Sequence, residues 1–262
     1  MKIPETKIAV TLYNLRNYCK TAPELDETLR KVKEIGYEAV QISGIGPIEP
    51  LVVKELLDKH QLYCCATHEN LDAYENNFDQ VVSKLKILNC DFTALGHPGN
   101  AFWNDSGAKE LAARLEKIGE RFKKEGIIFG YHNHHIEFAK FNGKTFLEEL
   151  FAATSTNVYA ELDVHWVQRG GADPVYWIRK MAGRTSVLHF KDFSIRINEK
   201  NESIPEFSEI GEGNLNWPAI LKACEETGVR WYVFEQDTPR GDRDMFESIK
   251  ITFDNMKKMG IK

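Results

Sequence analysis

Short apolar runs alternate with segments of helical periodicity about eight times along this 262-residue chain. The runs predicted to be strands are residues 7–13, 39–42, 62–67, 92–95, 158–163, 187–192 and 231–235, together with a strand that begins at residue 127. Between them, apolar side chains recur at helical spacing, as at Leu25, Leu29 and Val32. A repeating strand–helix unit requires a parallel sheet, and eight units favour a closed barrel over an open sheet. We therefore predict an α/β fold in which residues 1–262 form a single (β/α)8 barrel domain.

Composition and charge exclude several other classes of protein. The chain is 42% hydrophobic and 28% charged, as expected for a globular protein, and its formal net charge of −5 argues against a nucleic-acid partner. Its five cysteines form no C-x-x-C pair, which suits reduced thiols and a cytoplasmic protein. No apolar run reaches the roughly 20 residues needed to span a bilayer, and the first strand follows no signal-peptide core. We expect no membrane partner.

Four of the predicted strands end in side chains that bind metals or transfer protons. These residues are His132 and His134, Asp163 and His165, His189 with Lys191 and Asp192, and Glu235 with Asp237. In an α/β barrel the carboxyl ends of the strands form the active face, so the four groups should share one site. Imidazole and carboxylate ligands without thiolates suit one divalent ion such as Mn²⁺, Mg²⁺, Co²⁺ or Zn²⁺. Because side chains two apart share a strand face, Glu161 should lie one layer below Asp163.

The motifs at these strand ends resemble a known family. The segments YHNHHIEF, ELDVHW, VLHFKDF, GEGNLNW and VFEQD are similar to those of the xylose isomerase-like sugar phosphate isomerase/epimerase superfamily of TIM barrels, which includes D-tagatose 3-epimerase and inosose dehydratase. The resemblance implies one divalent metal held by Glu, Asp, His and Glu from strands five to eight. Three of these ligands correspond to Asp163, His189 and Glu235. His132 stands where the first Glu is expected, with His134 as the other candidate.

The resemblance also implies a reaction. It predicts a metal-dependent sugar isomerase or epimerase that removes the proton α to a carbonyl of a keto-sugar or related polyol. Glu235 is the expected base, and Lys191 is expected to stabilise the developing oxyanion or to donate to a leaving oxygen. In the epimerases a second metal-bound glutamate serves the opposite face of the substrate. Because His132 replaces it here, β-elimination by a keto-sugar or inosose dehydratase, or by a 3-keto-glycoside lyase, is an alternative. A non-catalytic sugar-binding barrel is another.

The remaining candidate residues would contact a small-molecule sugar. The predicted substrate-binding residues are His68, His97, Trp103, His134, Glu137 and His165. The polar stretch 194–216 is long for a connection between a strand and a helix, which is typical of an active-site loop. Many barrels of this type are dimers, so the resemblance also leads us to expect a homodimer.

Two structural alternatives stay open at this stage. Asp163, His189 and Glu235 could form a buried hydrogen-bonded network without a metal, and His132 could be a core histidine. A DNA-repair nuclease of the endonuclease IV type would need about three metals and a basic surface, which the acidic composition does not favour. The position of these side chains relative to one another therefore decides between a metal site and a plain network.

Overall fold

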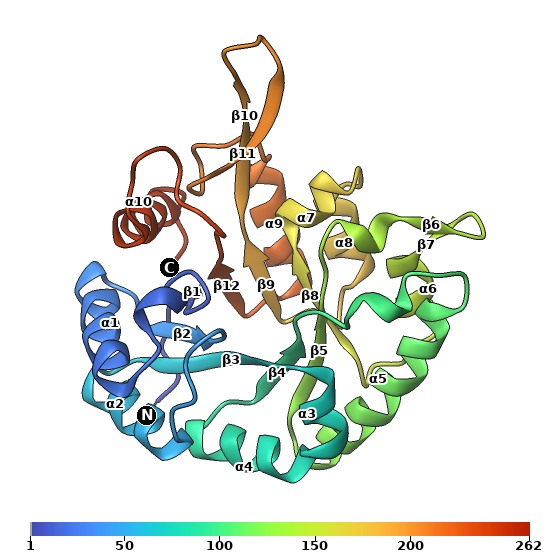
Figure 1. Ribbon diagram of the computed structural model, residues 1–262, viewed down its shortest axis with the longest axis horizontal. Coiled ribbons are helices and arrows are strands. Elements are labelled where there is room, and N and C mark those ends of the chain that lie inside the picture. The colour runs from blue at the N-terminus through green and yellow to red at the C-terminus, as the bar shows by residue number, and fades with distance from the viewer. Residues whose placement is uncertain (1) are drawn as a thin grey trace.

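The protein is an eight-stranded parallel barrel, seen in a computed structural model that describes residues 2–262 (Figure 1). Within these residues the strands follow one another around the closed barrel in chain order. They are β1 (Ile8–Thr11), β2 (Ala39–Ile42), β3 (Tyr63–Glu69), β4 (Phe92–Leu95), β5 (Ile128–His132), β8 (Tyr159–Asp163), β9 (Val187–Phe190) and β12 (Trp231–Phe234). The predicted single-domain (β/α)8 fold is confirmed, and the eight predicted strands correspond to these eight.

Helices surround the barrel on its outer side (Figure 1). They are α1 (Ala22–Ile35), α2 (Pro50–Lys59), α3 (Leu71–Asn76), α4 (Phe78–Leu88), α5 (Gly107–Lys124), α6 (Phe146–Ala152), α7 (Val164–Arg169), α8 (Pro174–Lys180), α9 (Trp217–Thr227) and α10 (Met245–Lys258). Short 3-10 turns are η1 (Arg16–Tyr18), η2 (Asn100–Phe102) and η3 (Ile136–Phe138). The described part of the chain, residues 2–262, contains no helix whose length and apolar character would let it cross a membrane.

Local sequence signals explain where several helices begin. Thr21 and Glu24 form a capping box at the start of α1, in which each side chain binds the other residue's backbone N–H. Asp173 caps α8 by accepting from the amide of Val175, with a proline at the first helical position, as its sequence predicts. The short helices α3 and α7 were not predicted, because six residues are too few to show a helical period.

Two apolar layers fill the fold. The larger one lies between the strands and the helices, and the smaller one consists of barrel-strand residues such as Ala9, Tyr63, Phe92 and Trp231. Several members of the smaller cluster are the first residues of their strands, so this plug occupies the amino-terminal end of the barrel. The interior at the carboxyl end is left to polar side chains.

The stretch predicted to be a long polar loop is largely a β-hairpin. β10 (Asp192–Ile197) pairs antiparallel with β11 (Ser203–Ser208), and the hairpin projects beyond the barrel at the top of Figure 1. Asp192 anchors its base, since its carboxylate accepts from the amides of Gly211 and Gly213 and from the indole Nε1 of Trp217 at 2.6 Å. A Cβ on Gly213 would lie 2.2 Å from this carboxylate, so only glycine fits there. The two-residue strands β6 (Lys140–Phe141) and β7 (Lys144–Thr145) pair antiparallel and form a second hairpin.

Candidate metal centre and active site

The register of the parallel strands brings the predicted site residues together. His132 at the end of β5 lies directly beside Glu161 on β8, and Asp163 at the end of β8 lies beside His189 on β9. Glu235 follows β12, whose residue Val233 pairs with His189. Three neighbouring strand ends and the residue after a fourth therefore point their ligand-type side chains at one region of the barrel interior.

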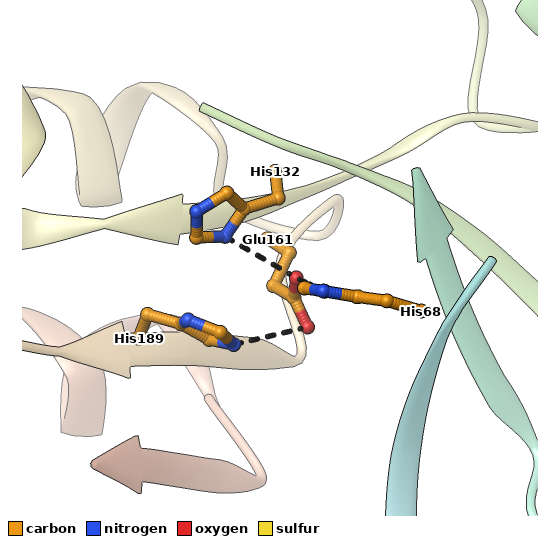
Figure 2. Close-up of side chains that lie close together, drawn as sticks. All are labelled: His68, His132, Glu161 and His189. Atoms are coloured by element: carbon orange, nitrogen blue, oxygen red, sulfur yellow. Dashed lines mark hydrogen bonds and ion pairs between the residues drawn. The ribbon is translucent and has the colours of Figure 1, made fainter. Parts of the chain in front are cut away.

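Glu161 is the centre of the deeper part of this site (Figure 2). Its Oε2 atom lies 2.5 Å from Nε2 of His68 and 3.4 Å from Nδ1 of His132, and its Oε1 atom lies 3.5 Å from Nε2 of His189. The side chain is fully buried. Burial by itself raises the pKa of this carboxyl, but the charges of His68 and His189 and the hydrogen bonds of the neighbouring imidazoles hold the pKa well below its usual range.

An irregularity in β3 turns His68 toward Glu161. The pairing between β2 and β3 shifts by one residue after Val40, which pairs with Cys64, whereas Gln41 pairs with Ala66. Cys65 and Ala66 consequently both pack in the barrel-interior cluster, and the alternation of the strand is inverted beyond them. Regular alternation from Cys65 would have directed Thr67 inward and His68 outward. The bulge therefore places an imidazole in the site.

Gln41 connects the deeper part of the site to His189. Its Nε2 donates to Oε1 of Glu161 at 2.9 Å, and its Oε1 atom lies 2.6 Å from Nε2 of His189. Because an amide oxygen can only accept, Nε2 of His189 carries the proton in this contact. The other ring nitrogen, Nδ1, lies 2.9 Å from Oε2 of Glu235. By binding Nε2, Gln41 therefore leaves Nδ1 of His189 directed toward Glu235.

Four residues in the upper part of the site could hold a metal ion. His132, Asp163, His189 and Glu235 each offer a ligand atom, and these atoms all lie within 4.8 Å of one another. Asp163 uses Oδ1 to cap α7 through the amide of Trp166 at 3.0 Å. Among the described residues, Oδ2 of Asp163 is buried without a hydrogen-bond partner, and the Nδ1 atoms of His132 and His189 face carboxylate oxygens at 3.4 and 2.9 Å without the geometry of a hydrogen bond. Buried polar atoms normally have partners, so this convergence fits a cation.

A second set of four ligand-type residues shares two members with the first. His68, His132, Glu161 and His189 also offer atoms within 4.8 Å of one another. In this set, however, the Glu161 oxygens are already bound by Gln41 and His68. The first set, which consists of His132, Asp163, His189 and Glu235, therefore fits a metal better. The second set supplies Glu161, a hydrogen-bond partner of the kind that commonly orients metal-bound imidazoles.

Lys191 supplies a positive charge next to the upper set. Its fully buried Nζ lies 3.0 Å from Oε1 of Glu235 and 2.5 Å from Oδ2 of Asp237, and it lies 4.6 Å from the ring of Trp166. Burial lowers the pKa of this ammonium group, but Glu235, Asp163 and Asp237 together raise it above its ordinary value. The lysine is therefore charged at any physiological pH.

Without a bound cation, the four upper residues carry shifted pKa values. Burial raises the pKa of Asp163 to about 7 although Lys191 opposes the shift. Burial lowers the pKa of His132 to about 4, with repulsion from His189 adding to the effect. His189 has a pKa of about 10, because the carboxylates of Glu161 and Glu235 outweigh the effect of burial. Burial would raise the pKa of Glu235, but Lys191 and His189 hold it well below its usual range.

A cavity of about 380 Å³ opens directly above the centre. Its lining residues come from the carboxyl ends of the strands and from the loops that follow them. They are Tyr13, Ser43, His68, Glu69, Asn70, Gly96, His97, His132, His134, Glu235 and Asp237. Its volume lies in the lower part of the range for small-molecule sites. Glu235 and His132 belong both to the cavity wall and to the candidate metal centre.

The predicted substrate-binding residues fall into two groups. His68, His97 and His134 line the cavity, and Trp103 stands behind His97, with ring centroids 6.0 Å apart. Glu137 and His165 are fully buried and are not among the lining residues. Their contacts with substrate hydroxyls stay predictions, as do the roles of the other residues.

Protein groups surround Glu137 and His165. The oxygens of Glu137 accept from Tyr131 Oη and from the amide of His134, both at 2.9 Å, and burial raises its pKa to about 7. The ring of His165 packs against Phe207 of the hairpin, with centroids 5.1 Å apart, and burial lowers its pKa to about 3. Glu137 therefore supports the cavity wall from behind through the amide of His134, whereas His165 packs among aromatic rings outside the lining.

Three residues of the site were not assigned a role from the sequence. Glu161 was expected only as a deeper neighbour of Asp163, Gln41 was not considered, and Asp237 was noted only as a polar strand end. Gln41 had a visible signal, since it is the one polar residue in the strand Ala39–Ile42. Glu161 had a similar signal, because an acidic residue inside an apolar strand must find a partner.

Comparisons with known proteins agree with this architecture. The chain is 21% identical over 271 aligned positions to the rhizopine catabolism protein MocC of Rhizobium meliloti, covering 90% of this chain and 81% of that protein. It is 19% identical to an inosose dehydratase of Lacticaseibacillus casei, covering 85% of each. Its fold is similar to the crystal structure of a sugar phosphate isomerase/epimerase from Parabacteroides distasonis, with a TM-score of 0.84, 23% identity and coverage of 99% and 96%. The model of the xylose isomerase-like TIM barrel family matches residues 29–257, and the chain belongs to that family.

Proposed function

We propose that the protein is a divalent-metal-dependent enzyme that removes the proton α to a carbonyl of a keto-sugar or related polyol. The observation that supports this most is the convergence of His132, Asp163, His189 and Glu235 within 4.8 Å at the floor of a cavity of about 380 Å³. The relatives named sugar phosphate isomerase/epimerase and inosose dehydratase support the same chemistry. Proton transfer next to a carbonyl is a step that these reactions share.

Each residue has a stated part in this proposal. His132, Asp163, His189 and Glu235 would hold one divalent ion, which would supply a Lewis acid for the substrate carbonyl. Glu235 lines the cavity and is ionised because Lys191 and His189 lower its pKa, so it is the proposed base. Lys191 holds Glu235 in place, and its positive charge would stabilise the negative charge that develops on the substrate oxygen.

The net reaction depends on the fate of the abstracted proton. Return of the proton to carbon gives isomerisation or epimerisation, which is the first candidate. The second candidate is β-elimination, favoured by the replacement of a second metal-bound carboxylate by His132. When an imidazole nitrogen of His132 binds the ion, its lone pair is engaged, and that nitrogen cannot accept a proton from the opposite face of a substrate. His134 lines the cavity and would then contact the leaving hydroxyl.

Solvent deuterium exchange into a panel of ketoses and keto-inositols tests the proposal. The protein is stripped with EDTA and assayed with and without Mn²⁺, Mg²⁺, Co²⁺ or Zn²⁺, and products are followed by NMR. We expect metal-dependent deuterium incorporation α to the carbonyl, and a product that has lost one molecule of water distinguishes β-elimination from isomerisation. Failure of every substrate to exchange in the metal-loaded protein would contradict the proposal and support a sugar-binding barrel without catalysis.

The variant Glu235→Gln tests the assignment of the base. We expect exchange to fall by roughly 100-fold or more, in line with loss of a positioned general base. Because Glu235 is also a proposed ligand, the metal content of the variant is measured in parallel, and the assay is repeated at saturating metal. Glu225→Gln, an exposed position on α9, is the matched control. Full activity in Glu235→Gln would show that another group is the base.

A further inference from the structure

The wall of the cavity carries an excess of negative charge. Three of its lining residues are carboxylates, namely Glu69, Glu235 and Asp237, and no lysine or arginine belongs to the lining within residues 2–262. The side chains of Glu69 and Asp237 are 20% and 30% exposed, so they face the space that a substrate would occupy. A bound molecule therefore meets acceptor oxygens at these two positions.

The cations next to the cavity are already engaged. Lys191 is fully buried between Glu235 and Asp237, and Lys84 binds Oε1 of Glu69 at 2.7 Å. The guanidinium of Arg16 donates to the backbone carbonyl of Tyr13 at 2.8 Å and to that of Asp237 at 3.3 Å. An anionic substituent on a substrate would have to compete with these partners for each cation.

A bound divalent ion does not reverse this balance. The centre and its surroundings contain the carboxylates of Glu161, Asp163, Glu235 and Asp237, against one lysine and the two charges of the ion. His189 contributes no charge when its Nδ1 binds a metal, because the ring is then neutral. These charges sum to −1, or to zero when His68 is protonated, so a bound ion does not make the site positive, and the pair between Glu69 and Lys84 adds no net charge.

We propose that the cavity accepts an uncharged polyhydroxy ketone and discriminates against its phosphorylated or carboxylated counterparts, with Glu69 and Asp237 setting the preference. The inference deepens the proposed function, on which it rests for the class of keto-sugars and keto-polyols. Sugar hydroxyls donate hydrogen bonds, and the exposed carboxylate oxygens of both residues accept them. A phosphate dianion placed at the same positions meets like charge, which weakens its binding.

Matched pairs of ligands test the proposal directly. The probes are D-fructose, D-ribulose and D-xylulose, each with its terminally phosphorylated counterpart. Binding to the metal-loaded protein is measured by calorimetry, and solvent deuterium exchange is measured separately. We expect the uncharged member of a pair to bind more tightly by roughly 100-fold. Equal or tighter binding of the phosphorylated member overturns the proposal, and loss of that binding in Arg16→Met would identify the cation responsible.

A charge variant makes the test specific to the cavity. Glu69→Gln removes one negative charge and leaves Lys84 unpaired, so the binding ratio should shift toward the phosphorylated member by about tenfold. Glu120→Gln removes the same charge from an exposed pair with Lys124 on α5 and should leave the ratio unchanged. An unchanged ratio in Glu69→Gln contradicts the role of this residue.

The two proposals fail in different ways. Preferred binding of the uncharged ketose without metal-dependent deuterium exchange supports the charge preference and contradicts the proposed proton transfer. Metal-dependent exchange that is faster with phosphorylated ketoses supports the proton transfer and contradicts the charge preference.

Discussion

The Gln41→Leu variant should weaken metal binding although Gln41 contacts no metal in the proposed arrangement. The amide of Gln41 accepts from Nε2 of His189 at 2.6 Å and donates to Oε1 of Glu161 at 2.9 Å. Each hydrogen bond to a charged partner contributes roughly 1.5–3 kcal/mol, so the loss of both removes about 3–6 kcal/mol from the buried network. Part of this loss is offset by burial of the leucine side chain. We expect the free energy of unfolding of the metal-free protein to fall by a few kilocalories per mole.

The effect on the metal follows from the orientation of His189. Without the amide oxygen of Gln41, the imidazole is free to rotate or to place its proton on Nδ1, which is the nitrogen directed at Glu235. Groups that orient metal-bound histidines typically contribute 10–100-fold to metal affinity. Calorimetric titration of the EDTA-stripped protein with Mn²⁺ or Zn²⁺ should therefore give a dissociation constant higher by about that factor in Gln41→Leu.

Two further variants sharpen this test. Gln41→Glu retains an acceptor for His189 but places a carboxylate against Glu161, so it should preserve more of the metal affinity than Gln41→Leu while destabilising the metal-free protein. Gln80→Leu, at an exposed position of α4, controls for loss of an amide elsewhere. Wild-type metal affinity in Gln41→Leu would refute the claim that this amide orients His189.

Two other predictions concern proton linkage and the anchor of the hairpin. Metal binding near pH 8 should release about one proton. His189 supplies it, because its pKa is about 10 when the site holds no cation and its ring must be neutral to bind a metal. Asp163 has a pKa of about 7 and is already mostly ionised at this pH. Metal affinity should accordingly rise with pH up to about 10 and fall more steeply below about 7, where Asp163 is protonated as well. Calorimetric titrations in buffers of different ionisation enthalpy measure the number of protons released. Metal binding without proton release would contradict the prediction. Asp192→Ala should lower the free energy of unfolding by about 3 kcal/mol or more, because several buried donors, the indole of Trp217 among them, lose a charged acceptor. Urea denaturation with Asp242→Ala, an exposed residue, as the control would check it, and an unchanged midpoint would refute it.

Much of the fold could be predicted because it depends on local patterns. Each barrel strand is a short apolar run bounded by turn residues, and each long helix shows its own period. The errors occurred where the pattern was too short or too polar. The six-residue helices α3 and α7 carry less than two helical turns of signal. Only three of the twelve residues of β10 and β11 are buried, so this polar segment showed no strand pattern and appeared to be a loop.

The candidate site was predictable in its location more than in its contacts. Asp163, His189 and Glu235 were expected to meet, and the structure places their ligand atoms within 4.8 Å of one another together with His132. That expectation needed only the rule that parallel strands end at the same face of a barrel. The central position of Glu161 in the deeper network was not expected, because strand alternation shows which face a residue shares but not which strand its side chain reaches.

By itself, the sequence determined the barrel, the face on which chemistry can occur, and the types of side chain at each strand end. Those properties follow from periodicity and strand direction, which are local. The tertiary structure alone decided that His68 points inward, since a one-residue bulge in β3 inverts the alternation there. It also decided that Gln41 joins Glu161 to His189, and that Lys191 is shielded by Glu235 and Asp237. Such contacts depend on the register and closure of eight strands at once, and no segment of the chain encodes them alone.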